Sequence, residues 1–174
     1  VSKIKPEFKM VFASLGKTYM ELGKINKALE CLKMALKFNQ NSPEIYNNLG
    51  LAYEGLSRFD ESLSSFKKSI ELNPNYEKAY NNLGNLLNTL GRYDESNEAF
   101  IKAIKIKPDY SKAYSNLLFN FIYKTNYDPE LYLLEAKKFR KNCKTNENQI
   151  HIKYKYEKKP QKLRLGLVSA DFGN

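Results

Sequence analysis

The fold is decided by residues 77–110, EKAYNNLGNLLNTLGRYDESNEAFIKAIKIKPDY, because the pattern of side-chain sizes in this stretch recurs every 34 residues. A leucine followed by a glycine recurs at Leu15-Gly16, Leu49-Gly50 and Leu83-Gly84. A period of this length predicts a helical repeat array. The other aligned positions are Phe12, Tyr46, Tyr80 and Tyr114; Tyr19, Tyr53, Leu87 and Phe121; Ala28, Ser62 and Ser96; and Leu32, Phe66 and Phe100.

Small and large residues alternate where two antiparallel helices of one repeat would touch. We expect the small residues to let paired helices approach closely, and the large ones to fill the space between repeats. Leu49, Leu83 and Leu117 are expected to be buried against their own repeat and its neighbour. The predicted fold is therefore all-α.

The spacing resembles the tetratricopeptide repeat, with prolines on schedule at Pro6, Pro74 and Pro108. This resemblance implies a right-handed superhelix. Residues 1–8 are interpreted as the tail of a truncated repeat, so the chain is taken as a fragment of a longer protein. Complete repeats are assigned to residues 9–42, 43–76 and 77–110.

The pattern breaks after residue 110. Leu118 stands at the position of the three glycines, so residues 111–142 are predicted to form a half repeat and a capping helix. The cap is placed at Glu130–Asn142, with Leu131, Leu134 and Phe139 on its apolar side. Residues 143–161 have the composition of a basic linker.

The hydrophobic period changes again at the end of the chain. Leu163, Leu165, Leu167 and Val168 form a short apolar run that predicts a buried strand followed by a turn. Because one strand cannot fold alone, residues 162–174 are interpreted as the opening of a truncated α/β domain.

The chain carries a formal net charge of +10, and most of the excess lies in one segment. Residues 131–164 hold 11 Lys/Arg against 3 Asp/Glu, whereas residues 1–130 hold 18 against 15. Basic residues interleaved with Tyr154 and Tyr156 could bind RNA. A solvated helix face and a lysine-rich linker explain the same charge, and we favour that interpretation over nucleic-acid binding.

No apolar run is long enough to predict a membrane span. Cys31 and Cys143 lack the spacing of a bridge or zinc site, and the only histidine, His151, has no second ligand at metal-binding spacing. We therefore propose no metal site and expect a cytoplasmic protein without contact to a membrane.

Three asparagines are the candidate binding residues: Asn48, Asn82 and Asn116 recur at the 34-residue spacing on the predicted inner face. An amide donates and accepts hydrogen bonds, so such a row can hold the backbone of an extended peptide whatever its sequence. We expect packing not to need these amides. The alternative is that asparagine is only a tolerated polar residue on an exposed helix face.

Residues 162–174, KLRLGLVSADFGN, closely resemble the opening strand and loop of the catalytic domain in O-linked N-acetylglucosamine transferases, the family that includes SPINDLY proteins. The resemblance implies that the repeats form the substrate-recognition arm of a two-lobed glycosyltransferase. That enzyme would transfer N-acetylglucosamine from UDP-N-acetylglucosamine to serine or threonine of acceptor proteins. Because the SPINDLY branch of the family is known for fucose, the resemblance does not decide between the two sugars.

By the same resemblance, Asn48, Asn82 and Asn116 match the family's peptide-holding asparagines, whereas Ser14 departs from that pattern. Asp171, Phe172, Gly173 and Asn174 would form a loop near the active site. No catalytic residue is expected in this chain, so residues 1–174 would bind polypeptide, need no cofactor and be inactive.

The runner-up is a non-catalytic adaptor that binds partner peptides. A clamp for a peptide carboxylate would need cations on successive repeats. Lys17, Asn48 and Lys78 could serve in part, but Asn82 stands where an arginine would be needed.

Overall fold

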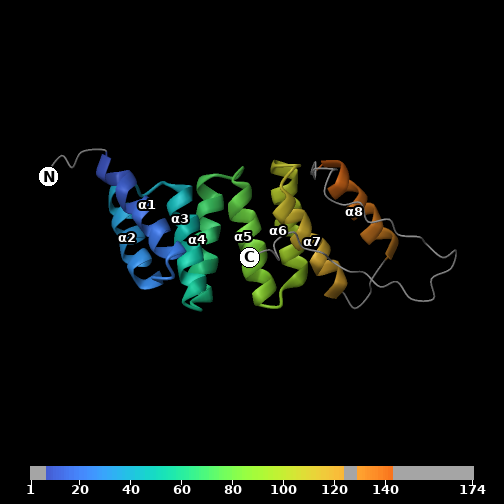
Figure 1. Cartoon of the computed structure of the whole chain (residues 1–174), viewed down its shortest axis with the longest axis horizontal. Helices are drawn as coiled ribbons and strands as arrows, with labels where there is room; N and C mark the ends of the chain where they lie inside the picture. The colour runs from blue at the N-terminus through green and yellow to red at the C-terminus, as the bar shows by residue number, and fades with distance from the viewer. Residues whose placement is uncertain (1–6, 124–128, 143–174) are drawn as a thin grey trace. The chain divides into compact units, whose positions relative to one another are not determined.

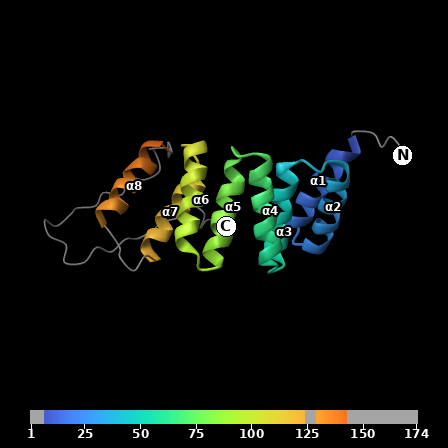
Figure 2. The same cartoon turned by 180° about the vertical axis from the view of Figure 1, so that it is seen from behind.

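The computed structural model describes residues 7–123 and 129–142, which form eight α-helices (Figures 1 and 2). Within this part of the chain no strand occurs, so the all-helical repeat architecture is confirmed there. The helices are α1 Glu7–Glu21, α2 Ile25–Phe38, α3 Pro43–Gly55, α4 Phe59–Leu72, α5 Glu77–Thr89, α6 Tyr93–Ile106, α7 Ser111–Tyr123 and α8 Pro129–Asn142.

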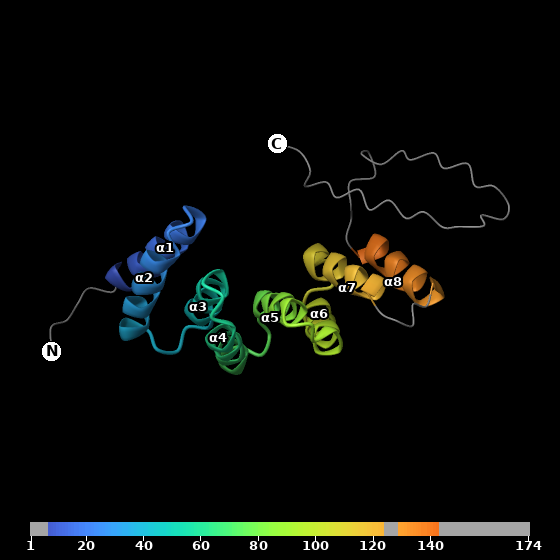
Figure 3. The same cartoon turned by 90° about the horizontal axis from the view of Figure 1, so that it is seen from below.

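Consecutive helices pack against each other in pairs, and the pairs follow one another along the array (Figure 3). We call α1, α3, α5 and α7 the first helices, and α2, α4, α6 and α8 the second helices. Each second helix also packs on the next first helix, so every repeat is stabilised by its neighbours.

Glycine allows close contact within each of the first three pairs. A Cβ atom built on Gly50 would lie 2.5 Å from Cε1 of Phe66, and one on Gly84 would lie 2.5 Å from Cε1 of Phe100. Both phenylalanines are fully buried, so their rings occupy the space that glycine leaves. Gly16 has the same relation to a leucine, with Cγ of Leu32 2.8 Å away.

Buried serines join the paired helices at the same place. Ser62 Oγ donates to the Gly50 carbonyl oxygen at 2.8 Å, and Ser96 Oγ donates to the Gly84 carbonyl oxygen at 2.8 Å. Each hydroxyl is satisfied without water, so these small residues both permit the close approach and bond across it.

The turn between first and second helices uses a left-handed residue at one repeat position. Gly23, Ser57 and Gly91 have φ of 70°, 57° and 73°. The following amide donates back into the first helix, as from Arg58 N to Tyr53 O at 2.9 Å, which completes a Schellman motif. Ser57 adopts at some steric cost a conformation that glycine takes freely.

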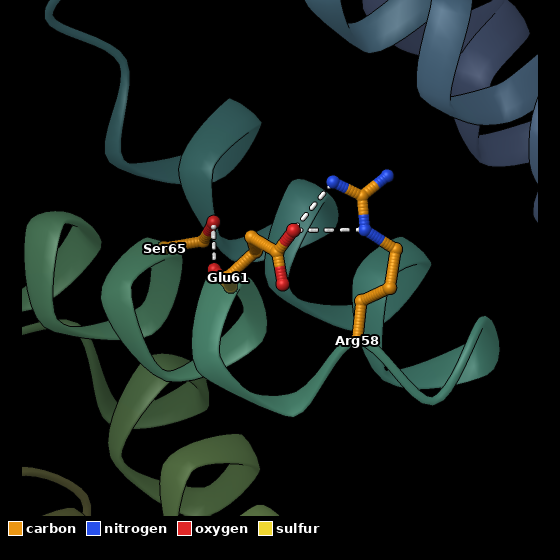
Figure 4. Close-up of polar contacts among 3 residues, drawn as sticks. All are labelled: Arg58, Glu61 and Ser65. Carbon is orange, nitrogen blue, oxygen red and sulfur yellow. Dashed lines mark hydrogen bonds and ion pairs between the residues drawn. The ribbon is translucent and has the colours of Figure 1, made fainter.

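The second helices α4 and α6 begin with acidic residues paired to arginine. Arg58 Nε donates to Glu61 Oε1 at 2.9 Å, and Arg92 Nε donates to Glu95 Oε1 at 2.7 Å (Figure 4 shows the first pair). The hydrogen bond from Arg58 lowers the pKa of Glu61. These carboxylates thus stabilise the starts of the two helices, where negative charge is favoured.

Two sequence-based expectations about burial are wrong. Leu49 and Leu117 are buried as predicted, but Leu83 is only half-buried because it lines an outer groove. In α8, Phe139 packs on Tyr114 with ring centroids 5.6 Å apart, whereas Leu134 is 50% exposed and is not part of a core.

Several predictions lie outside the described residues: the basic linker at 143–161, and the strand and loop at 162–174 with Asp171, Phe172, Gly173 and Asn174. The same holds for the predicted tail of a truncated repeat at 1–8, except that residues 7 and 8 begin α1. Across residues 7–123 and 129–142, no helix is long and apolar enough to cross a membrane. The same residues contain no group of three or more potential metal ligands.

Candidate peptide-binding face

The first helices form a continuous face. α1 contacts α3, α3 contacts α5, and α5 contacts α7, whereas within the described residues no second helix contacts another second helix. Side chains at equivalent positions of the first helices therefore lie next to one another across the repeats. The asparagine row is such a set, with Asn48 on α3, Asn82 on α5 and Asn116 on α7.

All three amides of the row are half-buried, but their surroundings differ. Asn48 makes no hydrogen bond to any described residue. Its carbonyl oxygen and both of its N–H groups are therefore available to a ligand.

Asn82 and Asn116 are already bonded across the repeats. Asn82 Nδ2 donates to Asn47 Oδ1 at 2.9 Å. Asn116 Nδ2 donates to Asn81 Oδ1 at 3.2 Å and to Asn85 Oδ1 at 2.8 Å. The expectation that packing does not need the row is thus wrong for two of its three members, because they tie α5 to α3 and α7 to α5.

The bonded amides still retain capacity for a ligand. Asn82 uses one N–H toward Asn47, and its oxygen accepts from Asn81 Nδ2 at a long 3.4 Å, so one N–H and one lone pair remain. Asn116 uses both N–H groups, and its oxygen accepts from no described residue. The hydrogen-bonding capacity left for a ligand therefore changes along the row. Asn48 on α3 can both donate and accept, whereas Asn116 on α7 can mainly accept.

Asn47 and Asn81 form a second, buried row that the sequence analysis missed. The signal was present, since Tyr-Asn-Asn-Leu-Gly occurs at 46–50 and again at 80–84. Only the second asparagine of each pair was assigned a role, because the period shows which positions are equivalent but not which side chains bond to each other.

A further polar cluster joins α5, α6 and α7. Asn88 and Asn120 exchange hydrogen bonds at 2.7 and 2.8 Å, and Asn120 Nδ2 also lies 2.9 Å from Asn97 Oδ1 and 3.1 Å from Ser96 Oγ. Asn120 is 2% exposed, so this cluster is part of the interior. It holds the C-terminal helices in register and is not accessible to a ligand.

Glu54 on α3 is a partly buried carboxylate with a shifted pKa. It aligns with Asn88 of the next repeat, but it has no hydrogen-bond or ion-pair partner among the described residues. Partial burial removes water from its carboxylate and raises its pKa.

The remaining candidates on the first helices are weaker. Ser14, at the position of the asparagine row in α1, is exposed, and its carbonyl oxygen accepts from Thr18 Oγ1 at 3.1 Å. Lys17 lies 3.7 Å from Glu21, so the cation that a carboxylate clamp would use is already paired.

Comparisons with known proteins agree with this architecture. Three family profiles match, one described as TPR repeat over residues 16–57 and two described as Tetratricopeptide repeat over residues 43–76 and 65–96. Comparison with the curated proteins gives no significant match. The chain belongs to the tetratricopeptide-repeat family.

Among solved structures, the chain is similar to two structures of MamA. One is 31% identical over 78% of this chain and 77% of that chain, with a TM-score of 0.65. The other is 30% identical over 77% of this chain and 72% of that chain, with a TM-score of 0.68.

An O-GlcNAc transferase mutant from Thermobaculum terrenum has the same repeat fold, with a TM-score of 0.73 and 19% identity. The match covers 81% of this chain but only 27% of that enzyme. At this identity the likeness shows the fold alone.

Proposed function

We propose that the repeats bind extended polypeptide on the face formed by the first helices, with Asn48, Asn82 and Asn116 holding the peptide backbone. The observation that carries this proposal is the half-exposed amide of Asn48, which has no partner in the described part of the chain. A peptide backbone offers alternating N–H and C=O groups, which match an amide that both donates and accepts.

The unequal bonding of the row suggests how each member contributes. Asn48 can donate and accept hydrogen bonds to a ligand without breaking a bond within the protein. Asn82 and Asn116 can use only the donor and acceptor groups that their cross-repeat bonds do not occupy. Asn48 should therefore contribute most to affinity, and the other two should also position the helices.

Similar folds support a peptide ligand. A tetratricopeptide-repeat domain of Spaghetti (RPAP3), 22% identical to this chain, was solved bound to an HSP90 peptide. This supports polypeptide as the ligand class here, and it carries no implication about the sequence of the peptide.

Fluorescence anisotropy with several unrelated, fluorescein-labelled unstructured peptides at fixed salt tests the proposal. Asn48→Ala should weaken binding by roughly 2- to 10-fold for every peptide that binds, because a lost net hydrogen bond is worth about 0.5–1.5 kcal/mol. Asn26→Ala, an exposed asparagine on α2, is the matched control and should bind like wild type. Unchanged affinity of Asn48→Ala for all peptides would refute the backbone-binding row.

We further propose that this unit is the substrate-recognition arm of a protein O-glycosyltransferase that uses UDP-N-acetylglucosamine. The observation in its favour is the resemblance of residues 162–174 to the opening of that family's catalytic domain. A non-catalytic adaptor explains the repeats equally well, and the similarity to MamA is compatible with it.

Sugar transfer separates these two functions. The protein encoded by the complete gene and residues 1–174 would each be incubated with radiolabelled UDP-N-acetylglucosamine, or with GDP-fucose, and a mixed peptide library. Transfer by the complete protein and none by residues 1–174 supports the transferase. If the complete protein transfers neither sugar, the adaptor function stands.

A further inference from the structure

A groove lies between the second helices α4 and α6 and over α5. It is open to solvent and has a volume of about 230 Å³. Its apolar walls are Leu63 of α4, Tyr80, Leu83 and Leu87 of α5, and Ala99 of α6. An apolar cavity of about 150 Å³ already accommodates benzene, so this one is large enough for a leucine or phenylalanine side chain.

The same groove one repeat earlier is filled by the protein itself. Tyr53 stands there at the position of Leu87, with Cζ of Arg58 4.7 Å and Nζ of Lys33 5.9 Å from its ring centroid. The leucines beneath are closed off, with Leu29 7% and Leu49 4% exposed. The open groove between α4 and α6 thus occurs in the repeat that has Leu87 where the preceding repeat has Tyr53.

The rim of the open groove is mainly basic. Lys67 and Lys102 border it, and Lys102 and Lys105 border an adjoining cavity of about 700 Å³ that shares Tyr80. Neither Lys102 nor Lys105 has a carboxylate partner among the described residues. Of the two carboxylates on the rim of the groove, Glu95 is held by Arg92, which leaves Glu98 against Lys67 and Lys102.

We propose that this groove is a second docking site, which takes an acidic peptide segment and buries one leucine- or phenylalanine-sized side chain between α4 and α6. The lysines would meet the carboxylates that flank the buried residue, while Leu63, Leu83 and Leu87 receive its side chain. The site uses none of the asparagines and does not rest on the proposed function.

A fluorescein-labelled peptide of aspartates and glutamates around one phenylalanine is the probe. Two control peptides replace the phenylalanine by serine or the acidic residues by lysine. In anisotropy titrations the probe should bind about tenfold or more tightly than either control, because one gives up the apolar anchor and the other the charge complementarity. Binding of the serine peptide as tight as that of the probe would overturn the proposal.

Two variants locate the site. Leu87→Tyr introduces, at a position that is 4% exposed in the wild type, the larger side chain that the first two repeats carry as Tyr19 and Tyr53. It should weaken probe binding about tenfold or more.

Lys102→Glu keeps the test valid even if Leu87→Tyr proves unstable, because Lys102 is exposed on α6. It should weaken binding roughly fivefold. The matched charge reversal is Lys37→Glu on α2, a position where the next repeat has Glu71, and it should have a much smaller effect. Equal losses in both variants would show attraction by net charge alone and would overturn the proposal, as would equal affinity of Lys102→Glu and wild type.

Discussion

The middle repeats, residues 43–76 and 77–110, differ from the C-terminal part, residues 111–142, at one pair of equivalent positions. In the middle repeats a glycine faces a phenylalanine that is 0% exposed, as Gly84 faces Phe100. In the C-terminal part the equivalent residues are Leu118 and Leu134, and Leu134 is 50% exposed. A helix pair closes over a large side chain only where the facing position has no Cβ atom.

The C-terminal pair is held by different contacts. α7 and α8 meet through the rings of Tyr114 and Phe139 and through a hydrogen bond of 2.8 Å from Asn142 Nδ2 to Tyr114 Oη. These contacts lie away from the glycine position of the other pairs. The loss of the glycine therefore accompanies a different set of contacts between the two helices.

Truncation of the inserted ring should have the largest effect. Phe100→Ala is expected to lower the free energy of unfolding by about 3–5 kcal/mol, because it removes a fully buried ring and leaves a cavity. Leu134→Ala, at the equivalent position of α8, should cost less than about 1 kcal/mol, since half of that side chain is already in water. Urea unfolding followed by circular dichroism measures both, and similar losses would contradict the distinction between the two regions.

The joints between the middle repeats should also differ from each other. Leu49→Ala should cost about 2–5 kcal/mol, because Leu49 is buried beneath the tyrosine-filled groove. Leu83→Ala, in the open groove, should cost about half as much or less, because its side chain is partly solvated in the folded state. Equal losses in the same urea titrations would show that the groove is closed in solution.

The buried amide cluster should have an intermediate effect. Asn120→Ala is expected to cost about 1–3 kcal/mol, because it leaves Asn88 and Asn97 with unsatisfied buried groups. Asn26→Ala, on the exposed side of α2, is the control and should change stability by no more than about 0.5 kcal/mol. If the two variants unfold at the same urea concentration, water replaces the lost bonds and the cluster does not hold α7 in place.

The repeat architecture could be predicted because it depends on positions that recur. Leu-Gly at the 34-residue spacing identifies where two helices touch, and Leu118 marks where this contact ends. A helix was also predicted at Glu130–Asn142, and α8 spans Pro129–Asn142. These features depend on the size of the side chain at single positions, and this size follows directly from the residue type.

The bonding of the asparagines and the open groove could not be predicted in the same way. Asn116 could bond to solvent, to a ligand or to Asn81 and Asn85, and only the distance between α5 and α7 selects the last. Leu83 is half-buried in the repeat that has Leu87, whereas Leu49 is 4% exposed in the repeat that has Tyr53 at the equivalent position. Both properties depend on pairs of positions far apart in the sequence, and the repeat period does not reveal them.

The smallest effect concerns Glu54, which stands on α3 where the next repeat has the bonded Asn88. Burial raises the pKa of Glu54 above its ordinary value, so the folded state disfavours the ionised carboxylate. Below the pKa of the unfolded chain both states are protonated and the penalty is absent; it grows as the pH rises through the higher folded pKa and is complete above it. Glu54→Gln should therefore raise the urea midpoint at pH 7, and this gain should disappear as the pH falls below about 4.5. The exposed Glu30→Gln on α2 is the matched control and should shift the midpoint less at pH 7. If the urea midpoint of wild type at pH 7 is equal to or higher than that of Glu54→Gln, the Glu54 carboxylate has a bonding partner in solution. Glu54 would then be hydrogen-bonded or ion-paired, as Asn88 is hydrogen-bonded in the next repeat.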